Sequence, residues 1–558
     1  MAQYKTPDVY VREKSTLPPS VAEVATAIPV FVGYTEKTLD SKEASIVQKP
    51  IKISTMADYH AIFGGRDEES FGVFIPEDQE AFVIRSPGTQ EEITQLDTDI
   101  AEEEKKVTST AGATVTAQKN VDDAEKTLKD AVESGNDVTS VEVKAVEVAN
   151  AALENAKSDE GEAKKKLVKS LGNKFKKSAV NDGSKQLPKF ILAQSVEHFF
   201  ANGGGACYVV STGDYSASPS MANFKDALEV ISAIDEITLL CLVDAHALDD
   251  MNYYNLQVKA LDQCSKLQDR FTLIDTIEKS NADLLSAQIS ADALALRGAV
   301  TGDLKYGAAY YPNLLTSYAR HYSDEKVNVY IEDSAGLFLD PVAMNTLEKG
   351  TATYNLVKKV LSKNYLTLPP TPAVAGMMAK VDGTRGVWKA PANVALSMVQ
   401  MPTKTIKNTD QDDLNVDVIS GKSINAIRSF TGKGNLVWGA RTLAGNDNEW
   451  RYISVRRLFN MVEESIQKAT AFAVFEPNTP FTWLKLKTMM ESYLTNLWKQ
   501  GALFGDTPEQ AFSVNVGLGQ TMTEDDINNG IMNIEIGLAA VRPAEFIILT
   551  FSHKSIEA

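Results

Sequence analysis

The sequence predicts an α/β (α+β) protein of several domains, and three observations support that prediction. The chain has 558 residues, which is too long for a single hydrophobic core and indicates about two to four domains. Between residues 190 and 366, short apolar runs alternate with helical patterns, as in a mixed or parallel sheet covered by helices. The composition changes sharply near residue 91 and again after residue 366, so we expect domain boundaries there.

The first 20 residues are predicted to form an N-terminal arm. Val9, Tyr10 and Val11 make a short strand-like run, and Leu17-Pro-Pro19 keeps the chain extended after it. A terminal strand with no nearby partner in its own chain often pairs with a neighbouring molecule. After the arm, a buried strand is expected at 28–34 and a short helix, capped by glycine, at 58–65.

Residues 91–187 are predicted to form an acidic helical insertion. Between Phe82 and Phe175 there is no aromatic residue, and acidic side chains outnumber basic ones. Apolar residues recur at helical spacing over 121–131 and again over 141–152, which favours a hairpin with a thin seam of alanine and valine. The alternative is a solvated or partly disordered linker. A membrane-binding or partner-binding helix is disfavoured, because the helix faces lack large apolar residues.

The chain resumes a folded pattern at residue 190. A helix, a glycine turn and a strand are expected over 196–210, and further buried strands at 237–243, 270–275 and 327–332. With residues 21–90, the stretch 188–367 is predicted to form the middle α/β domain. A C-terminal core domain is expected at 368–540, after a proline-rich joint, and a C-terminal arm at 541–558.

A helix beginning near Val455 is the strongest pattern in the C-terminal core domain. Its apolar residues form one stripe at helical spacing, which predicts a face packed on a core. A second amphipathic helix is expected over 484–503, ending at Gly501. The polar face predicted for the first helix carries Arg456, Arg457, Glu463, Glu464 and Lys468.

The last strand-like run is apolar on both faces. It consists of Glu545, Phe546, Ile547, Ile548, Leu549, Thr550 and Phe551. Strands of this kind lie in the middle of a sheet, and an isolated edge this hydrophobic promotes aggregation. Two interpretations remain open: the run completes a sheet shared with other subunits, or it is a buried strand of its own domain.

Charge and composition exclude several classes of function. A net charge of −18 argues against binding to nucleic acid or to an anionic membrane surface. No apolar run approaches the roughly 18–20 residues of a membrane helix, and the N-terminus lacks the apolar region of a signal peptide. Cys207, Cys241 and Cys264 are far apart and match no metal motif, which fits a reduced, cytosolic origin.

No catalytic constellation is apparent in the sequence. The glycine turn at 202–205 lacks GK[ST] and precedes a strand, so it is interpreted as a structural turn. The five histidines are scattered, and adjacent aspartates such as Asp249-Asp250 point in different directions. We therefore predict no enzyme, no catalytic or metal site and no cofactor.

A dense C-terminal block identifies the family that the chain resembles. It comprises Trp438–Leu443, Glu449–Leu458 and Val474–Pro477, and it resembles the C-terminal region of contractile tail sheath proteins of myophages, R-type pyocins and contractile injection systems. Further resembling segments occur in family order along the chain, except over 91–187, and a stretch at 415–424 is expanded. These segments are 4–13, 198–210, 369–376, 384–393, 501–505 and 541–547.

The resemblance implies a structural and mechanical subunit. Sheath proteins stack as hexameric rings around an inner tube and contract to drive the tube through a target envelope, so the implied partners are copies of the chain, the tube protein, and baseplate and terminal cap proteins. The final location would be a phage virion or a contractile injection particle. The resemblance makes the middle domain the outer one and the C-terminal core domain the inner one. A static self-assembling tube or shell and an α/β enzyme are the alternatives.

The resemblance also assigns roles to residues. Strand exchange between subunits would use Val9–Val11 and Glu545–Phe551. Contact with the tube would use Glu524, Asp525 and Asp526 in a short helix, whose alternative reading is a capped surface helix with acids at its positive end. The densely packed centre of the inner domain would contain Arg385, Trp388, Trp438, Arg441, Trp450, Arg456 and Arg457.

Overall fold

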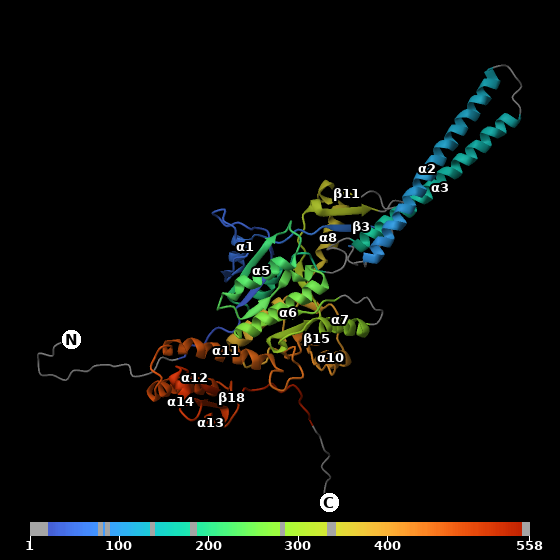
Figure 1. Ribbon diagram of the computed structural model, residues 1–558. Coiled ribbons are helices and arrows are strands. Elements are labelled where there is room, and N and C mark those ends of the chain that lie inside the picture. The colour runs from blue at the N-terminus through green and yellow to red at the C-terminus, as the bar shows by residue number, and fades with distance from the viewer. Residues whose placement is uncertain are drawn as a thin grey trace, which may run out of the picture.

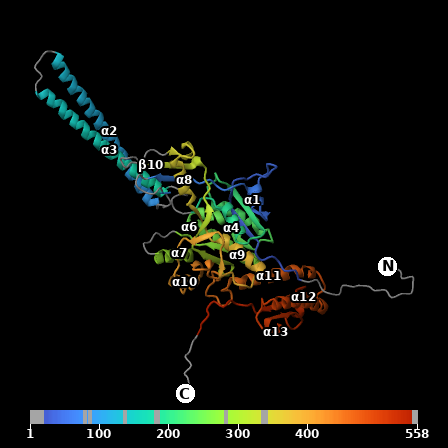
Figure 2. The same ribbon diagram turned by 180° about the vertical axis from the view of Figure 1, so that it is seen from behind.

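The computed structural model describes residues 21–75, 82–83, 90–133, 140–178, 187–278, 285–331 and 342–549. The predicted α/β class is confirmed, and the described strands form four separate sheets. Figure 1 shows a central sheet layer, with a long helical hairpin projecting on one side and a helical module on the opposite side. The view from behind in Figure 2 shows the same order of parts.

A nine-stranded sheet forms the centre of the molecule. Its strands run parallel from β15 to β5, and antiparallel strands close both edges, as is usual where helices cover both faces. In spatial order the strands are β13 (Val394–Ala395), β16 (Gly434–Val437), β15 (Ile424–Phe430), β8 (Gly307–Tyr311), β7 (Phe271–Asp275), β6 (Leu239–Cys241), β1 (Pro29–Thr35), β5 (Cys207–Asp214) and β2 (Ile51–Ile53).

Helices bury both faces of this sheet. Along β1, Val30 and Val32 pack into one hydrophobic core, and Phe31 between them packs into the other, as the two-residue period of a strand requires. The first core contains α5 (Met221–Ser232), α6 (Asp250–Leu267) and α7 (Leu285–Ala299), with α10 (Asn408–Asn415) beside them. The second contains α1 (Met56–Phe63), α4 (Leu192–Ala201) and α9 (Thr371–Arg385).

The domain boundary predicted between residues 367 and 368 does not separate two cores. Strands β13, β15 and β16, from the predicted C-terminal domain, complete the central sheet, and α9 packs into its second core. The proline-rich segment is the start of α9 rather than a joint, because proline is tolerated in the first turn of a helix. Just before it, β12 (Tyr365–Leu368) lies in a three-stranded sheet with β9 (Leu314–Ala319) and β14 (Val399–Pro402).

A small four-stranded sheet carries the helical insertion. The strand predicted at 327–332 belongs here, because β10 pairs in parallel with β3 rather than with the central sheet. The sheet packs on α8 (Ala352–Ser362) around its own core. Its strands in order are β11 (Val342–Ala343), β10 (Val327–Ile331), β3 (Phe71–Ile75) and β4 (Phe82–Val83).

The two predicted helices of the insertion are present. They are α2 (Gln90–Glu133) and α3 (Ser140–Ser178), which pack against each other along most of their length. Only a few side chains are buried in the seam, among them Ile100, Val121 and Leu153. The hairpin interpretation therefore holds for the described residues, and the linker alternative does not.

The C-terminal module begins after the central sheet. Helix α11 (Ile453–Thr470) packs with its predicted apolar stripe on α12 (Pro480–Lys499), which ends before Gly501, and both share a core with a two-stranded sheet. The remaining elements are α13 (Pro508–Ala511), β17 (Phe512–Asn515), α14 (Glu524–Asn528) and β18 (Glu535–Leu538). In Figure 1 this module lies on the side of the molecule away from the hairpin.

Candidate functional site at the roots of the two terminal arms

The C-terminal arm is attached to the body through one carboxylate. Glu545 accepts hydrogen bonds from Arg441 Nη2 at 2.6 Å and Nε at 2.9 Å, and from Asn415 Nδ2 at 2.9 Å. The Tyr452 hydroxyl adds a fourth bond at 3.2 Å. Burial alone would raise the pKa of Glu545, but these hydrogen bonds and the charge of Arg441 together lower it. The root of the arm is therefore a charge-assisted anchor.

The side of Arg441 that faces the body is also fixed. Its backbone N–H donates to Asn425 Oδ1 at 2.8 Å, and Asn425 Nδ2 donates to the carbonyls of Ala309 and Arg441. Asn425 lies on β15 in the middle of the central sheet. The anchor of the arm is thus held by a rigid strand.

Beyond Glu545 the arm is apolar and exposed. Phe546, Ile547, Ile548 and Leu549 are between 71% and 87% exposed, and no helix or strand is formed there. For these residues the alternative of a buried strand in their own domain is wrong. Thr550 and Phe551 lie outside the described residues. An exposed apolar run of this length marks a surface that a partner covers.

The two-stranded sheet of the C-terminal module has no further strand beside it within the described residues. β17 pairs antiparallel with β18 from Phe512↔Leu538 to Asn515↔Glu535. An isolated pair of strands is marginal in water, and here one face packs on the core of the module. Its free edges offer unpaired backbone groups to another strand.

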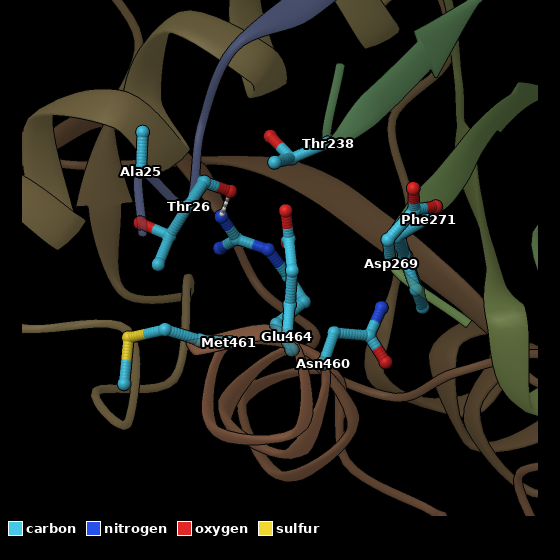
Figure 3. Close-up of a pocket in the computed structure, with 9 residues that line it drawn as sticks. Ala25, Thr26, Thr238, Asp269, Phe271, Asn460, Met461 and Glu464 are labelled. Carbon is cyan, nitrogen blue, oxygen red and sulfur yellow. Dashed lines mark hydrogen bonds between the residues drawn. The ribbon is translucent and has the colours of Figure 1, made fainter. Parts of the chain in front are cut away.

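The N-terminal linker, residues 21–28, is attached to the body by a second arginine. Arg457 Nη2 donates to the Thr26 carbonyl at 2.7 Å and to Asp382 Oδ2 at 2.5 Å, and Nη1 reaches Asp382 Oδ1 at 3.2 Å. The Thr26 hydroxyl donates to the same carboxylate at 2.6 Å. Figure 3 shows Thr26 against this guanidinium, above α11. The predicted arm residues Val9, Tyr10 and Val11 precede the linker and lie outside the described residues.

A small polar cavity lies beside the linker. Its volume is about 10 Å³, about the space of one water molecule, and Thr238, Asn460 and Glu464 are among its lining residues. Burial raises the pKa of Glu464 and also that of Glu23 in the linker. The cavity is too small for an organic ligand.

Arg456 and Arg457, which the sequence placed on the polar face of the helix and the resemblance placed in the densely packed centre, are buried. The Arg456 guanidinium lies 4.3 Å from the Trp450 ring and 4.9 Å from the Tyr306 ring, and it donates to Asn460 and Glu463. A guanidinium whose donors are satisfied and whose faces lie on aromatic rings tolerates burial. Glu464, which was predicted on the same polar face, is also buried.

The other residues expected in one densely packed centre lie at different places. The Trp438 ring packs at a tilt on the ring of Phe430 in β15, with the two ring centroids 4.6 Å apart. Arg385 and Trp388 line a separate cleft of about 360 Å³ at the C-terminal arm, together with Arg542. The structure thus divides the predicted centre into an Arg441 anchor, an Arg456 aromatic box, an Arg457 anchor and this cleft.

The predicted tube-contact residues lie on a short capped helix. Thr523 caps α14, and its N–H and hydroxyl both donate to the Asp526 carboxylate, at 2.9 and 2.8 Å. Glu524 and Asp525 are exposed. Asp526 therefore serves as a helix-capping residue, as the alternative interpretation expected, whereas the side chains of Glu524 and Asp525 are accessible to a partner.

Sequence reasoning missed Asp382 and Asn425. Asp382 lies in the last turn of α9, where the helix dipole disfavours an acid, so its position signalled that a cation must lie close by. No local signal pointed to Asn425, because its partners come from β8 and from the segment after β16.

Titratable side chains gather at Asp292, which accepts hydrogen bonds from the Tyr311 hydroxyl at 3.0 Å and from Lys404 Nζ at 2.7 Å, but the part of the chain that the structure describes has no metal cluster. No group of three or more His, Cys, Asp or Glu side chains is placed to hold a metal ion there. Burial lowers the pKa of His198 to about 4 and raises that of Asp244 to about 7. Both groups serve the fold: His198 bonds the Ser397 carbonyl, and Asp244 accepts backbone N–H groups of Tyr34 and Ile191. Among the described helices, none is both long and apolar enough to cross a membrane.

These features define the class of protein by its fold: an α/β protein with several sheets, in which the apolar residues that follow Glu545 are exposed. Residues 445–554 match the family model for the phage tail sheath C-terminal domain. The tail sheath protein of Vibrio phage KVP40 is 28% identical over 131 residues, which are 24% of this chain and 19% of that protein. The tail sheath protein of Enterobacteria phage T4 is 26% identical over 137 residues, which are 25% of this chain and 20% of that protein. The chain thus spans about a fifth of the length of these curated relatives.

Solved structures match over nearly the whole chain. A chain of the anti-feeding prophage baseplate has a TM-score of 0.55 and 26% identity, with 99% of this chain and 100% of that chain covered. A chain of the PVC sheath complex, an extracellular contractile injection system in its contracted state, has the same score and identity, with 99% of each chain covered. The predicted resemblance to contractile tail sheath proteins is confirmed, over residues 445–554 by the family model and over nearly the whole chain by the solved structures.

Proposed function

We propose that this chain is the subunit of a contractile sheath, which stacks as hexameric rings around an inner tube and shortens to drive that tube through a target envelope. The matching curated relatives are tail sheath proteins, and one matching structure is a sheath complex in the contracted state. Copies of the chain are the main partners in this proposal. The tube, the baseplate and a terminal cap are the others.

The observation that carries the proposal is the exposed C-terminal arm. It is fixed at Glu545 and then presents four large apolar side chains to solvent. Burying each of them against a partner contributes about 1.5–3 kcal/mol. A monomer gains nothing from such a segment, whereas a lattice of identical copies does.

In this proposal the C-terminal arm pairs with a sheet of a neighbouring copy by strand exchange. The free edges of the β17–β18 sheet accept the run Glu545–Phe551 of one neighbour and the run Val9–Val11 of another, so that each sheet contains strands from several copies. Backbone hydrogen bonds of a ladder are kept during rigid-body rotation when the linkers absorb the movement. Val541-Arg542-Pro543 and Leu17-Pro-Pro19 are such linkers.

The inner surface and the outer surface are assigned by the same reasoning. α14 contacts the tube through Glu524 and Asp525, which pair with basic residues of the tube protein. The α2–α3 hairpin decorates the outside, because it projects from the side opposite the C-terminal module and buries few side chains.

The energy of contraction is stored at assembly as the difference in free energy between two packings of the subunits, without a nucleotide. Assembly takes place in the bacterial cytoplasm, before incorporation into a phage or injection particle, and involves neither nucleic acid nor a membrane.

Electron microscopy of the purified chain, alone and with its tube protein, tests the proposal. We expect tubes of two widths and lengths from wild-type protein, and loss of tubes when residues 546–558 are deleted. Deletion of residues 1–20 is expected to give the same loss. A single invariant tube form would indicate a static shell instead, and normal tubes from both deletions would contradict strand exchange.

A further inference from the structure

The cleft at the C-terminal arm is a cluster of cations without an acid. Arg385, Lys389 and Arg542 line it, and among the described residues none of the three forms an ion pair. The buried arginines of the same region differ, because Arg441 and Arg457 each bind a carboxylate. In a chain with a net charge of −18, three unpaired cations in one cleft point to an anionic occupant.

The cleft is built rather than incidental. The Trp388 ring folds back over Gly386, where an added Cβ would lie 2.4 Å from the ring, so the backbone there requires glycine at φ +88°. Lys389 is tied by its Nζ to the Ala390 carbonyl at 2.8 Å. Partial burial, and then the neighbouring charge of Arg385, lower the pKa of Lys389. An incoming carboxylate relieves both effects.

A projecting loop at the other end of the module has the complementary chemistry. Phe475 is fully exposed and has φ +69°, a left-handed conformation that a side chain with a Cβ disfavours. The Glu476 carboxylate beside it is exposed and has no ion pair among the described residues. This pair of residues is called the knob below.

The knob is held rigidly. Glu476 N–H donates to the Ala473 carbonyl at 3.1 Å on one side. On the other side Asn478 Nδ2 donates to the Ile531 carbonyl at 2.9 Å, and Trp483 Nε1 donates to Asn478 Oδ1 at 2.6 Å. A strained backbone held in place by several bonds, with an aromatic ring in solvent, is typical of a binding surface.

Knob and cleft lie at opposite ends of α12. The knob precedes the start of α12 at Pro480, and the cleft follows its end, where Val541 N–H donates to the Ala502 carbonyl. A helix of 20 residues is about 30 Å long, so the two surfaces of one chain do not meet. A contact between them is head-to-tail, and contacts of that type generate rings or helical arrays.

We propose that the knob of one copy binds the cleft of the next copy, with the Phe475 ring against Trp388 and the Glu476 carboxylate paired with Arg385, Lys389 and Arg542. The proposal rests on the proposed function, since it requires that copies assemble head to tail. An aromatic ring in a pocket, surrounded by charge pairs, is the usual composition of an interaction hot spot.

A charge exchange between two full-length variants tests this contact. Glu476→Arg leaves a basic knob with a basic cleft, and Arg542→Glu leaves an acidic knob with a less basic cleft, so each variant alone is expected to lose about tenfold or more in assembly. Mixed in equal amounts, the two variants are expected to regain part of the assembly. The Glu476 knob of the second variant then meets the unaltered cleft of the first, and the arginine introduced at 476 meets the glutamate introduced at 542. The readout is the assembled fraction by sedimentation and electron microscopy as a function of salt.

Matched controls separate the contact from general charge or apolar effects. Glu325→Arg and Lys433→Glu reverse exposed charges elsewhere and are expected to assemble like wild type. Phe475→Ala is expected to lose about tenfold, and Met251→Ala, which removes another exposed apolar side chain, is expected to lose nothing. Thermal unfolding establishes that each variant is folded.

The outcomes distinguish this contact from the sheath function itself. Wild-type assembly together with normal assembly of Glu476→Arg, Arg542→Glu and Phe475→Ala overturns the contact and leaves the sheath function intact. Loss in the single variants without recovery in the mixture also overturns it. A wild-type chain that stays monomeric at every concentration, with and without the tube, overturns both.

Discussion

The two ends of the described chain are both held by a buried arginine, but the carboxylate comes from different places. At the N-terminal linker, Arg457 pairs with Asp382 of the body, and the linker contributes only the carbonyl and hydroxyl of Thr26. At the C-terminal arm, the arm itself supplies the carboxylate, Glu545, to Arg441. Release of the linker therefore leaves an intact ion pair behind, whereas release of the arm leaves a buried cation without its anion.

This difference makes the C-terminal root the firmer of the two anchors. Separating a buried charge pair costs more than breaking hydrogen bonds to neutral groups. In the proposed sheath, the N-terminal linker would then detach from the body more readily than the C-terminal root.

The largest effect is expected at the pair that belongs to the body. Arg457→Met leaves Asp382 buried without a cation, which is expected to destabilise the fold by about 3–5 kcal/mol. Chemical denaturation followed by tryptophan fluorescence measures this. The double variant Arg457→Met with Asp382→Leu serves as the control and is expected to regain much of the loss. An unchanged midpoint for Arg457→Met alone would show that the pair is not a stabilising element.

A smaller effect, confined to the arm, is expected at Glu545. Glu545→Gln removes the charge but keeps the shape, and the hydrogen bonds to Arg441 are expected to weaken by about 1.5–3 kcal/mol. Limited proteolysis within 546–549 is expected to become faster, while cleavage in the body stays constant. Glu524→Gln, an exposed acid outside the anchor, is the matched control. Equal protection of the arm in both variants would contradict the anchor.

The two roots are also expected to respond to acid in opposite ways. The folded pKa of Glu545 is lowered from 4.5, so its contribution is complete above 4.5 and is lost as the pH falls through the lower folded value. The folded pKa of Glu23 is raised from 4.5 by burial, so its charged carboxylate disfavours the attached linker at high pH, and that cost is lost as the pH falls through the raised folded value.

Fluorescence anisotropy of a dye on Leu549→Cys follows the acid response of the arm, because the three native cysteines are buried. We expect the anisotropy to fall only below pH 4.5, and to lack that transition when Glu545→Gln is added. A transition above pH 4.5 would contradict the assigned direction of the Glu545 pKa.

Local patterns explain which elements were predicted from the sequence. Strong apolar patterns predicted four elements, namely β1, β7, α1 and α11. The bounds that were predicted for them lie within two residues of those in the structure. Such elements are determined by side chains within one turn or one strand of each other. The resemblance to sheath proteins supplied the function, since the sequence itself has no catalytic pattern.

Long-range partners explain what was not predicted. The helical pattern placed Arg456 and Arg457 on the polar face of α11, but it did not show which groups pair with them. The Trp450 ring beside Arg456, and Asp382, 75 residues from Arg457, make their burial favourable. The domain boundary failed for a different reason: prolines near 370 begin a helix instead of ending a domain. For the run after Glu545 the sequence left two interpretations open, a strand shared with other subunits and a buried strand of its own domain, and among the described residues no strand lies beside it.

The smallest effect is expected at the linker, and it tests the comparison most directly. Thr26→Val keeps the shape of the side chain but removes the hydroxyl that donates to Asp382 at 2.6 Å, which costs about 0.5–1.5 kcal/mol. Because Arg457 still binds both the Asp382 carboxylate and the Thr26 carbonyl, global unfolding is expected to change little, and hydrogen exchange over 21–28 is expected to rise. Thr238→Val removes the hydroxyl that accepts from Ile28 N–H at 2.8 Å, so it is a second linker variant and is expected to raise hydrogen exchange over 21–28 in the same way. If Thr26→Val lost as much stability as Arg457→Met, the linker and the Arg457–Asp382 ion pair would unfold together. The N-terminal linker would then be held as firmly as the C-terminal arm, and the proposed difference between them would be wrong.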